Sequence, residues 1–428
     1  MNYWPRCTGV ILGGLAIGGF LIAASGIVPI KASSGHWAIT DWFLHFAMRR
    51  SIATQSLGIE SPTLDEPGLV LKGAGHYETG CAPCHGSPQR PPRFAEAMTP
   101  RPPYLPPRLS EWSSDDLFYV VKHGVKFTGM PGWPALGRDD EVWAMVAFLR
   151  QLPSLDAEEY RWLAYGENEV ALTEGSPDPE STPIAVTESC TRCHGTDGRG
   201  RGAGAFPKLA GQRPAYFAVT LEAYARGERH SGIMEPIAAG LSSAEVRELA
   251  RYYAGLPGSA ATLPEPATAR AIERGKKMAE DGAPKQRVPA CVACHGPRSV
   301  PRNPAYPVLA GQYADYLVLQ LQLFKAQQRG GSDYAHIMRR VAAGLSIAQI
   351  RDVARYYASL TPGPGRLEVA MKLILPALDA PRSPFRRTGT TYYRYSLAHG
   401  FGFRCAPFDS MFDCSDNRKD HPCENSTK

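Results

Sequence analysis

The fold of this chain is decided by three short stretches: Cys81-Ala-Pro-Cys84-His85, Cys190-Thr-Arg-Cys193-His194 and Cys291-Val-Ala-Cys294-His295, each followed by glycine. Two cysteines and a histidine at this spacing form the attachment pattern of c-type haem. The thiols add to the haem vinyl groups as thioethers, and the histidine is placed to ligate the iron on one face. We therefore expect three covalently bound haem c groups, one for each domain-sized stretch of sequence.

Other interpretations of paired cysteines explain the pattern less well. Two Cys-x-x-Cys pairs that close one zinc site normally lie about 15–20 residues apart, whereas these motifs begin at residues 81, 190 and 291. A thioredoxin-like pair needs a strand followed by a helix, and no strand pattern surrounds these motifs. A framework of disulfides would not place histidine and then glycine after every pair.

Length and charge set the broad class of the protein. A chain of 428 residues allows about three domains of roughly 100–150 residues each. The formal net charge of +6 is mildly basic. No dense run of lysine and arginine accompanies it, so we expect no nucleic-acid partner. Six of the ten cysteines lie in the three motifs.

The N-terminal region predicts a membrane anchor. Residues 7–30 contain no charged side chain, and a helix of that length reaches about 36 Å, enough to cross a hydrocarbon core of about 30 Å. The alternative is a cleaved signal peptide, although Ile22-Ala-Ala24 and Ile30-Lys-Ala32 are poor cleavage sites. Because haem attachment is expected outside the cytoplasmic membrane, we predict a bacterial protein whose N-terminus stays inside and whose haem domains lie in the periplasm.

Composition and patterning divide the rest of the chain, and little strand signal appears in it, so we predict an all-α fold. The predicted divisions are a transmembrane anchor over 1–30, a juxtamembrane helix over 31–61, haem domains over 62–153, 183–258 and 259–361, a linker over 154–182, and a polar, disordered tail over 362–428. Within that tail, Cys405, Cys414 and Cys423 match no haem or zinc pattern, and two of them could pair.

The second and third haem domains are repeats of each other. Three pairs of segments match: Phe206-Pro-Lys-Leu-Ala-Gly-Gln212 with Tyr306-Pro-Val-Leu-Ala-Gly-Gln312, Ala238-Ala-Gly-Leu-Ser242 with Ala342-Ala-Gly-Leu-Ser346, and Ala250-Arg-Tyr-Tyr-Ala254 with Ala354-Arg-Tyr-Tyr-Ala358. An offset near 100 residues across a whole domain indicates duplication, because the period is too long for a solenoid.

Each haem iron needs a ligand on its second face, and each domain offers a methionine at a similar distance after its motif. These methionines are Met130, Met234 and Met338. Ligation by histidine and methionine raises the reduction potential relative to two nitrogen ligands. We therefore predict His85 with Met130, His194 with Met234, and His295 with Met338 as the three ligand pairs.

Other residues compete for these roles. Met98 is the rival of Met130, and His123, His230 and His336 are rivals in the three domains, although they are better explained as surface or propionate-side residues. Pro207 and Pro307 follow the motif histidines closely, so their carbonyls could accept a hydrogen bond from the second ring nitrogen. In the first domain this stretch is crowded with proline, and no single residue is predicted there.

Residues 183–361 resemble the di-haem cytochrome c4 family in their Cys-x-x-Cys-His-Gly motifs, the Pro-x-Leu-Ala-Gly-Gln run, the late methionine and the Arg-Tyr-Tyr helix. Residues 31–153 resemble a membrane-anchored mono-haem cytochrome c in Gly80-Cys-Ala-Pro-Cys-His-Gly86 and Thr128-Gly-Met-Pro-Gly132. These resemblances imply three class I cytochrome c domains behind an N-terminal transmembrane helix. They also imply that the second and third domains pack face to face.

The leading functional hypothesis is an electron carrier. Irons with protein ligands on both faces have no open position for a substrate, so redox chemistry at them is electron transfer. We expect a relay of single electrons in a respiratory chain, from a quinol-oxidising complex to a terminal oxidase or reductase. The alternative is the cytochrome subunit of a membrane-bound dehydrogenase that passes substrate electrons to quinone. A haem peroxidase would need an open or displaceable iron position.

Overall fold

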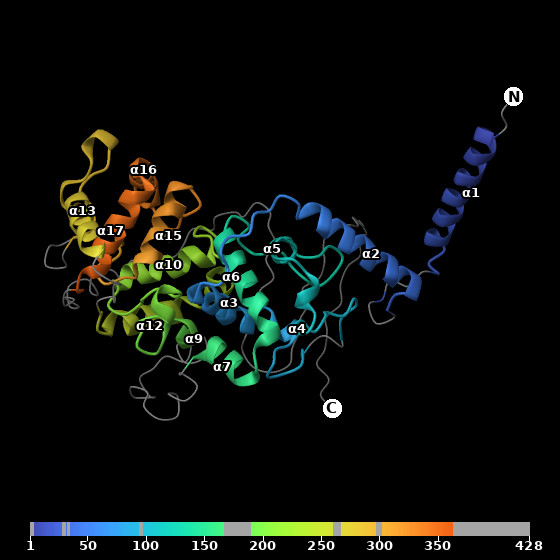
Figure 1. Cartoon of the computed structure of the whole chain (residues 1–428), viewed down its shortest axis with the longest axis horizontal. Helices are drawn as coiled ribbons and strands as arrows, with labels where there is room; N and C mark the ends of the chain where they lie inside the picture. The colour runs from blue at the N-terminus through green and yellow to red at the C-terminus, as the bar shows by residue number, and fades with distance from the viewer. Residues whose placement is uncertain are drawn as a thin grey trace, which may run out of the picture.

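The computed structural model describes residues 4–27, 31, 35–93, 97–166, 190–259, 267–296 and 302–362. Its described residues form helices joined by loops, with two isolated β-bridges and no strand. The predicted all-α fold is confirmed. Figure 1 shows α1 and α2 at one end of the molecule and the helices α13 to α17 at the other. The tail beyond residue 362, with its three cysteines, lies outside the described residues.

The first haem unit is built on two crossing helices. Its elements are α3 (Pro67–Gly80), α4 (Ala82–His85), η3 (Leu109–Glu111), α5 (Ser114–His123), α6 (Asp139–Gln151), η4 (Leu152–Ser154) and α7 (Ala157–Tyr165). Tyr77 on α3, Phe148 on α6 and Tyr160 on α7 are each 0% exposed. Their rings contact one another in the middle of the unit, so three helices share one aromatic core.

The structure corrects the predicted linker over 154–182. Its described part, up to residue 166, contains helix α7, which packs on α3 through the fully buried Tyr160. The helix begins with a capping box between Asp156 and Glu159, a pattern that satisfies free backbone N–H groups at a helix start. Residues 154–166 therefore belong to the first unit. Residues 167–182 lie outside the described residues.

The second and third units repeat one arrangement. The second contains α9 (Thr191–His194), η6 (Gly202–Gly204), α10 (Pro214–Ala225), α11 (Met234–Ala239) and α12 (Ser243–Gly255). The third contains α13 (Ala267–Asp281), η7 (Pro284–Gln286), α14 (Val292–His295), α15 (Ala314–Lys325), α16 (Ala335–Gly344) and α17 (Ile347–Ser359). Ser242 and Ser346 start α12 and α17 with matching capping boxes, which explains why the sequence before both helices is the same.

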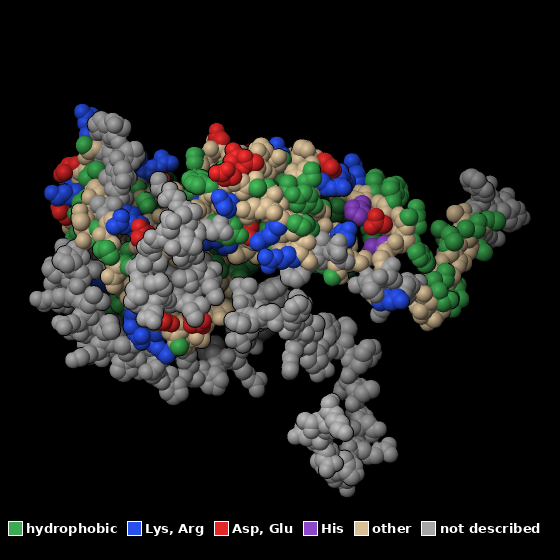
Figure 2. All heavy atoms as spheres, turned by 90° about the horizontal axis from the view of Figure 1, so that it is seen from below, with side chains coloured by type: hydrophobic (Ala, Val, Ile, Leu, Met, Phe, Trp, Pro, Cys, Tyr) green, Lys and Arg blue, Asp and Glu red, His purple; other side chains and the backbone are tan. Residues whose placement is uncertain are grey.

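The N-terminal helices lie outside the three units. Helix α1 (Trp4–Ala24) contains an 18-residue stretch, Cys7–Ala24, with a mean hydropathy of 2.1. It is long and apolar enough to cross a bilayer, a property that signal sequences share. Hydrophobic side chains cover its surface (Figure 2). Helix α2 (Ala38–Gln55) contacts the first unit, because Ile52 is buried, Arg49 pairs with Glu111, and Ser56 just after it donates to Asp116.

Glycine permits the closest helix crossings in the first and third units. A Cβ placed on Gly73 of α3 would collide with Ala144 O and lie 2.6 Å from Phe148 Cβ on α6. Gly275 of α13 meets α17 in the same way, at Asp352 O and Tyr356 Cβ. Only a residue without a side chain allows the two backbones to approach so closely.

We predict that Gly73→Ala destabilises the first unit by about 1–3 kcal/mol, because the added methyl group overpacks the crossing of α3 with α6. Gly68→Ala on the same helix is the matched control, since a Cβ there meets nothing within 4 Å, and its effect stays within about 1 kcal/mol. Thermal unfolding, followed by Soret absorption and tryptophan fluorescence, compares the two variants. Equal melting curves would contradict the role assigned to Gly73.

Candidate haem sites

Each Cys-x-x-Cys-His motif folds into one short turn of helix: α4, α9 and α14. Positions i, i+3 and i+4 of a helix share one face, so both thiols and the histidine ring of a motif point to the same side. The six motif cysteines form no disulfide. The local backbone therefore presents two thiols and one imidazole together, as the attachment of one haem requires.

The glycine after each motif is required by the backbone. Gly86 and Gly195 have φ values of 71° and 76°, in the left-handed region that glycine favours. Gly296 has a φ of −75°, but a Cβ there would lie 2.5 Å from Val292 O. In all three units the chain turns sharply away from the motif, and a side chain at this position would strain that turn.

The motif histidines are oriented by proline carbonyls. His85 Nδ1 donates to Pro103 O at 2.9 Å, His194 Nδ1 to Pro207 O at 3.0 Å, and His295 Nδ1 to Pro307 O at 3.1 Å. A carbonyl only accepts, so the proton sits on Nδ1 and Nε2 keeps a free electron pair for iron. The predicted roles of Pro207 and Pro307 are confirmed, and Pro103, which no sequence pattern distinguishes from its neighbouring prolines, has the same role in the first unit.

Burial keeps these motif side chains uncharged in the polypeptide. It lowers the pKa of His85 and of His194, and it lowers the pKa of His295 to about 4. It also raises the pKa of the Cys81 and Cys190 thiols to about 12. Neutral imidazoles and protonated thiols in an apolar setting suit thioether attachment of a large apolar ring, and they do not suit a reactive thiolate.

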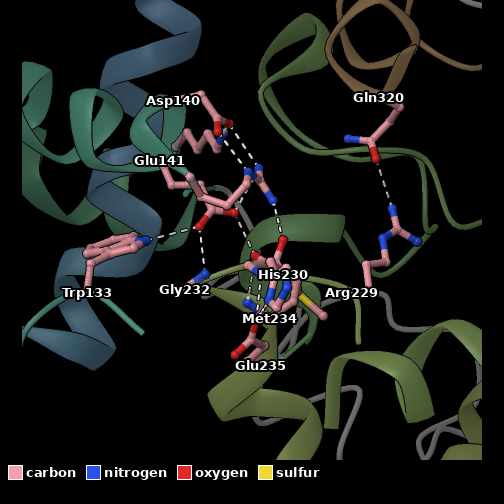
Figure 3. A network of polar contacts seen from close by, with 12 residues as sticks. Trp133, Asp140, Glu141, Arg229, His230, Gly232, Met234, Glu235 and Gln320 are labelled. Atoms are coloured by element: carbon pink, nitrogen blue, oxygen red, sulfur yellow. Dashed lines mark hydrogen bonds and ion pairs between the residues drawn. The ribbon is translucent and has the colours of Figure 1, made fainter. Parts of the chain in front are cut away.

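A cluster of buried cations between the second and third units fits the propionates that a haem would bring. Arg229 is 5% exposed and Arg329 is 9% exposed, and among the described residues neither guanidinium pairs with a carboxylate. Arg229 donates to Tyr316 OH at 2.9 Å, and Arg329 donates to Tyr216 OH at 3.1 Å, so each arginine reaches into the other unit. Figure 3 shows the further bond of Arg229 to Gln320.

The positive charge of this cluster is not balanced by the polypeptide described. Burial acts to raise the pKa of Tyr216, but the two guanidiniums outweigh burial and lower the pKa to about 8. Arg329 Nε is buried without a hydrogen-bond partner among the described residues. Buried charges require counter-charges, and haem propionates would supply carboxylates here. The residues present therefore fit the group that the motifs predict.

The three predicted methionine ligands are all partly buried: Met130 lies in a loop, Met234 is the first residue of α11, and Met338 lies within α16. Met130 N donates to Thr128 Oγ1 and Met234 N to Ser231 Oγ, each at 3.1 Å. Met338 lies within α16 and packs against Phe324 and its neighbours. Iron ligation by these methionines stays a prediction.

The rival ligands differ in their surroundings. His123, His230 and His336 are exposed, as expected of surface residues. Met98 is partly buried, and its Cε lies against Gly129, next to Met130. Met98 is therefore a rival whose side chain contacts the loop of the predicted ligand Met130.

The second and third units are joined by reciprocal bonds from the repeated glutamines. Gln212 Nε2 donates to Val308 O at 3.1 Å, and its Oε1 accepts from Val308 N at 2.7 Å. Gln312 pairs with Lys208 in the same way, at 2.9 Å and 3.0 Å. Lys208 and Val308 each follow the proline that binds the motif histidine. The two proximal loops are therefore held against each other around a local twofold arrangement.

The first unit packs directly on the second. A Cβ on Gly75 of α3 would lie 2.9 Å from Phe206 Cζ and 3.3 Å from Cys193 Sγ, so α3 covers one edge of the second motif. Arg201 donates to Trp162 O at 2.8 Å on α7. Nothing in the sequence predicts this contact, because the residues involved lie far apart along the chain and share no pattern.

Comparison with known proteins agrees with this geometry. Residues 68–149 match the family described as cytochrome C oxidase, cbb3-type, subunit III. A thiosulfate dehydrogenase electron acceptor of Thiomonas intermedia is 38% identical over 183 residues, which are 42% of this chain and 83% of that protein. A cytochrome c4 of Thiocapsa roseopersicina is 33% identical over 186 residues, 43% of this chain and 93% of that protein.

Solved structures include relatives of the same kind. Reduced recombinant cytochrome c4 from Pseudomonas stutzeri is 32% identical and covers 40% of this chain and 94% of its own, with a TM-score of 0.36. Thiosulfate dehydrogenase from Marichromatium purpuratum is 34% identical and covers 45% of this chain and 40% of its own, with a TM-score of 0.37. With its haem-attachment motifs and electron-carrying relatives, this chain belongs to the class I c-type cytochromes.

Proposed function

We propose that this protein is a membrane-anchored periplasmic relay with three haems, which passes single electrons between a redox enzyme and a membrane oxidase or reductase. The observation that supports it best is the threefold recurrence of one arrangement: two thiols, an imidazole fixed by a proline carbonyl, and a partly buried methionine downstream. Haem c bound in these sites would supply reversible one-electron chemistry. His85 with Met130, His194 with Met234, and His295 with Met338 would hold the three irons.

The polypeptide contributes orientation and insulation at each site. A neutral motif histidine presents Nε2, since Nδ1 is committed to the proline carbonyl. A methionine on the second face leaves no position for a substrate, and a soft thioether favours the reduced iron. The motif thiols are only partly exposed, so a haem bound over them would have limited contact with water, which lowers the reorganisation that each electron transfer requires. These properties suit an electron carrier and not a peroxidase.

Contacts between units give the proposed relay a continuous path. Helix α3, which ends at the first motif, also lies against the second motif at Gly75. The glutamine pair and the crossed arginine–tyrosine pairs join the second unit to the third. Electrons would therefore pass along the chain within one folded body, without diffusion of separate domains.

The relatives support a direction for the flow. The first unit, nearest α1 and α2, matches a family named for an oxidase subunit. The chain is also similar to a relative that is named as a thiosulfate dehydrogenase electron acceptor, and the second and third units have the motifs that resemble cytochrome c4. We infer that electrons enter from an oxidoreductase at the second and third units and leave through the first. The alternative, a dehydrogenase subunit that delivers electrons to quinone, uses the same three haems with another membrane partner.

Membrane attachment is supported by two neighbouring helices. None of the membrane-length stretch Cys7–Ala24 is buried, and α2 has exposed aromatic side chains, including Trp42 and Phe46. Aromatic residues favour the interface between lipid and water. Because α2 is fixed to the first unit by Arg49 and Ser56, an inserted α1 would keep that unit close to the membrane surface.

We predict three covalent haems per chain in a pyridine haemochrome assay, each with histidine and methionine ligands. In the oxidised protein the long-wavelength sulfur-to-iron band should fall by about a third in each of Met130→Ala, Met234→Ala and Met338→Ala, because each variant removes one thioether ligand. Met98→Ala is the control and should leave the band unchanged. A variant that retains the full band would show that its haem uses a different ligand.

We predict that the protein fractionates with membranes and that limited proteolysis between residues 31 and 61 releases the haem units. The apolar stretch is long enough to span the bilayer, so a chain that retains it stays in the membrane fraction. If the stretch were a cleaved signal sequence, the mature chain would lack it and would be soluble. Immunoblotting of membrane and soluble fractions, with N-terminal sequencing of the mature chain, provides the measurement. A mature chain that starts near residue 33 in the soluble fraction would refute the anchor.

A further inference from the structure

A buried carboxylate of the first unit lies in the contact with the second. Glu141, at the start of α6, is 2% exposed. Its carboxylate accepts from Trp133 Nε1 at 3.2 Å, from Ser231 Oγ at 2.6 Å and from Gly232 N at 2.7 Å. Arg138 balances its charge at 2.9 Å. Figure 3 shows Trp133 and Gly232 on either side of Glu141, with dashed lines to its carboxylate.

Two of those donors belong to the loop that leads to Met234, and the first unit holds the rest of this loop as well. Arg138 Nη1 donates to His230 O at 2.7 Å. The Trp133 ring lies against Gly232, where a Cβ would collide with it. Ile233 packs against the hydrophobic core of the first unit. All four residues before Met234 are therefore contacted from the first unit.

Ser231 connects Glu141 of the first unit to Met234 by two hydrogen bonds. Its hydroxyl donates to Glu141 and accepts from Met234 N at 3.1 Å. One oxygen atom thus joins the buried carboxylate to the backbone of the predicted ligand. In the first unit Met130 N donates the corresponding bond to Thr128 Oγ1 of the same loop. The two loops use a similar hydroxyl, but only the second has its hydroxyl fixed by a carboxylate from another unit.

Movement of the Met234 loop would be costly because of this arrangement. Lifting residues 231 and 232 away would leave Glu141 with a buried charge that has lost two of its hydrogen bonds, and such a loss is strongly unfavourable. The loop is therefore held most firmly at the point where a methionine would have to stay on iron. Asp140 supports the arrangement, because it binds the other edge of Arg138 at 2.7 Å and 2.9 Å.

We propose that Glu141 is a positioning residue for the second haem: docking of the first unit, through Glu141 and Ser231, holds Met234 on the iron of the second unit. This inference rests on the proposed ligation by Met234. The contact between the first and second units would then do more than hold the two units together. A neighbouring domain would control how firmly the second haem keeps its sixth ligand.

The test uses the full-length, haem-loaded protein and imidazole as a competing ligand. In Glu141→Ala, imidazole should displace one methionine in three, with loss of about a third of the sulfur-to-iron band, at a rate at least tenfold above that of the unchanged protein. Asp352→Asn is the matched control. Asp352 is a buried carboxylate of the third unit, bound by Arg274 at 2.7 Å and 2.9 Å, and its loss should leave the displacement rate unchanged.

Measurements on Met234→Ala, alone and combined with Glu141→Ala, show which haem is affected. They also separate the claim that Met234 ligates iron from the claim that Glu141 positions it. A Met234→Ala band equal to that of the unchanged protein would refute ligation by Met234, whatever Glu141 does. If Met234→Ala removes its third of the band, adding Glu141→Ala should produce no further fast displacement. Unchanged imidazole kinetics in Glu141→Ala, or equal acceleration at all three haems, would overturn the positioning role. If Glu141→Ala does not accumulate, Ser231→Ala is the variant to measure. We expect imidazole to displace Met234 faster in Ser231→Ala than in the unchanged protein. An unchanged displacement rate would contradict the proposal.

Discussion

The hydrogen bond from a motif histidine to a proline carbonyl is the constraint on which the rest of the structure depends. It occurs in all three units, and it fixes both the tautomer and the direction of the ring. In the second unit the same peptide group that accepts from His194 through Pro207 O donates through Lys208 N to Gln312. The third unit repeats this with Pro307, Val308 and Gln212. Contact between the two units therefore polarises the groups that orient both histidines.

The first unit joins this pair by different means. Its contact with the second unit is a set of hydrogen bonds made by the buried Arg138–Glu141 pair, with the backbone of α3 placed on the second motif at Gly75. Glutamine amides hold the proximal loops of the second and third units, whereas a carboxylate holds the methionine loop of the second. The second unit is thus constrained on both sides of its predicted haem, which suits a central position in a relay.

Much of this could be predicted from the sequence, because the motifs, the repeated segments and the helix patterns are local. The Ser-capped starts of α12 and α17 and the roles of Pro207 and Pro307 follow from short stretches of residues. The packing of α7, the role of Pro103 and the Glu141 network were not predictable in this way. Each depends on partners distant in sequence, such as Glu141 with Ser231, and no periodicity or motif marks them. Glu141 itself resembles any acidic residue in the first turn of a helix.

The central claim is that the three haems exchange electrons within one molecule, and one kinetic measurement tests it most directly. The oxidised protein is mixed with less than one electron equivalent of a fast reductant, and redistribution among the spectrally distinct haems is followed over time. Our account predicts redistribution at a rate that does not depend on protein concentration, since the units are in contact. A rate that rises in proportion to protein concentration would show that electrons move only between molecules, and it would contradict the relay.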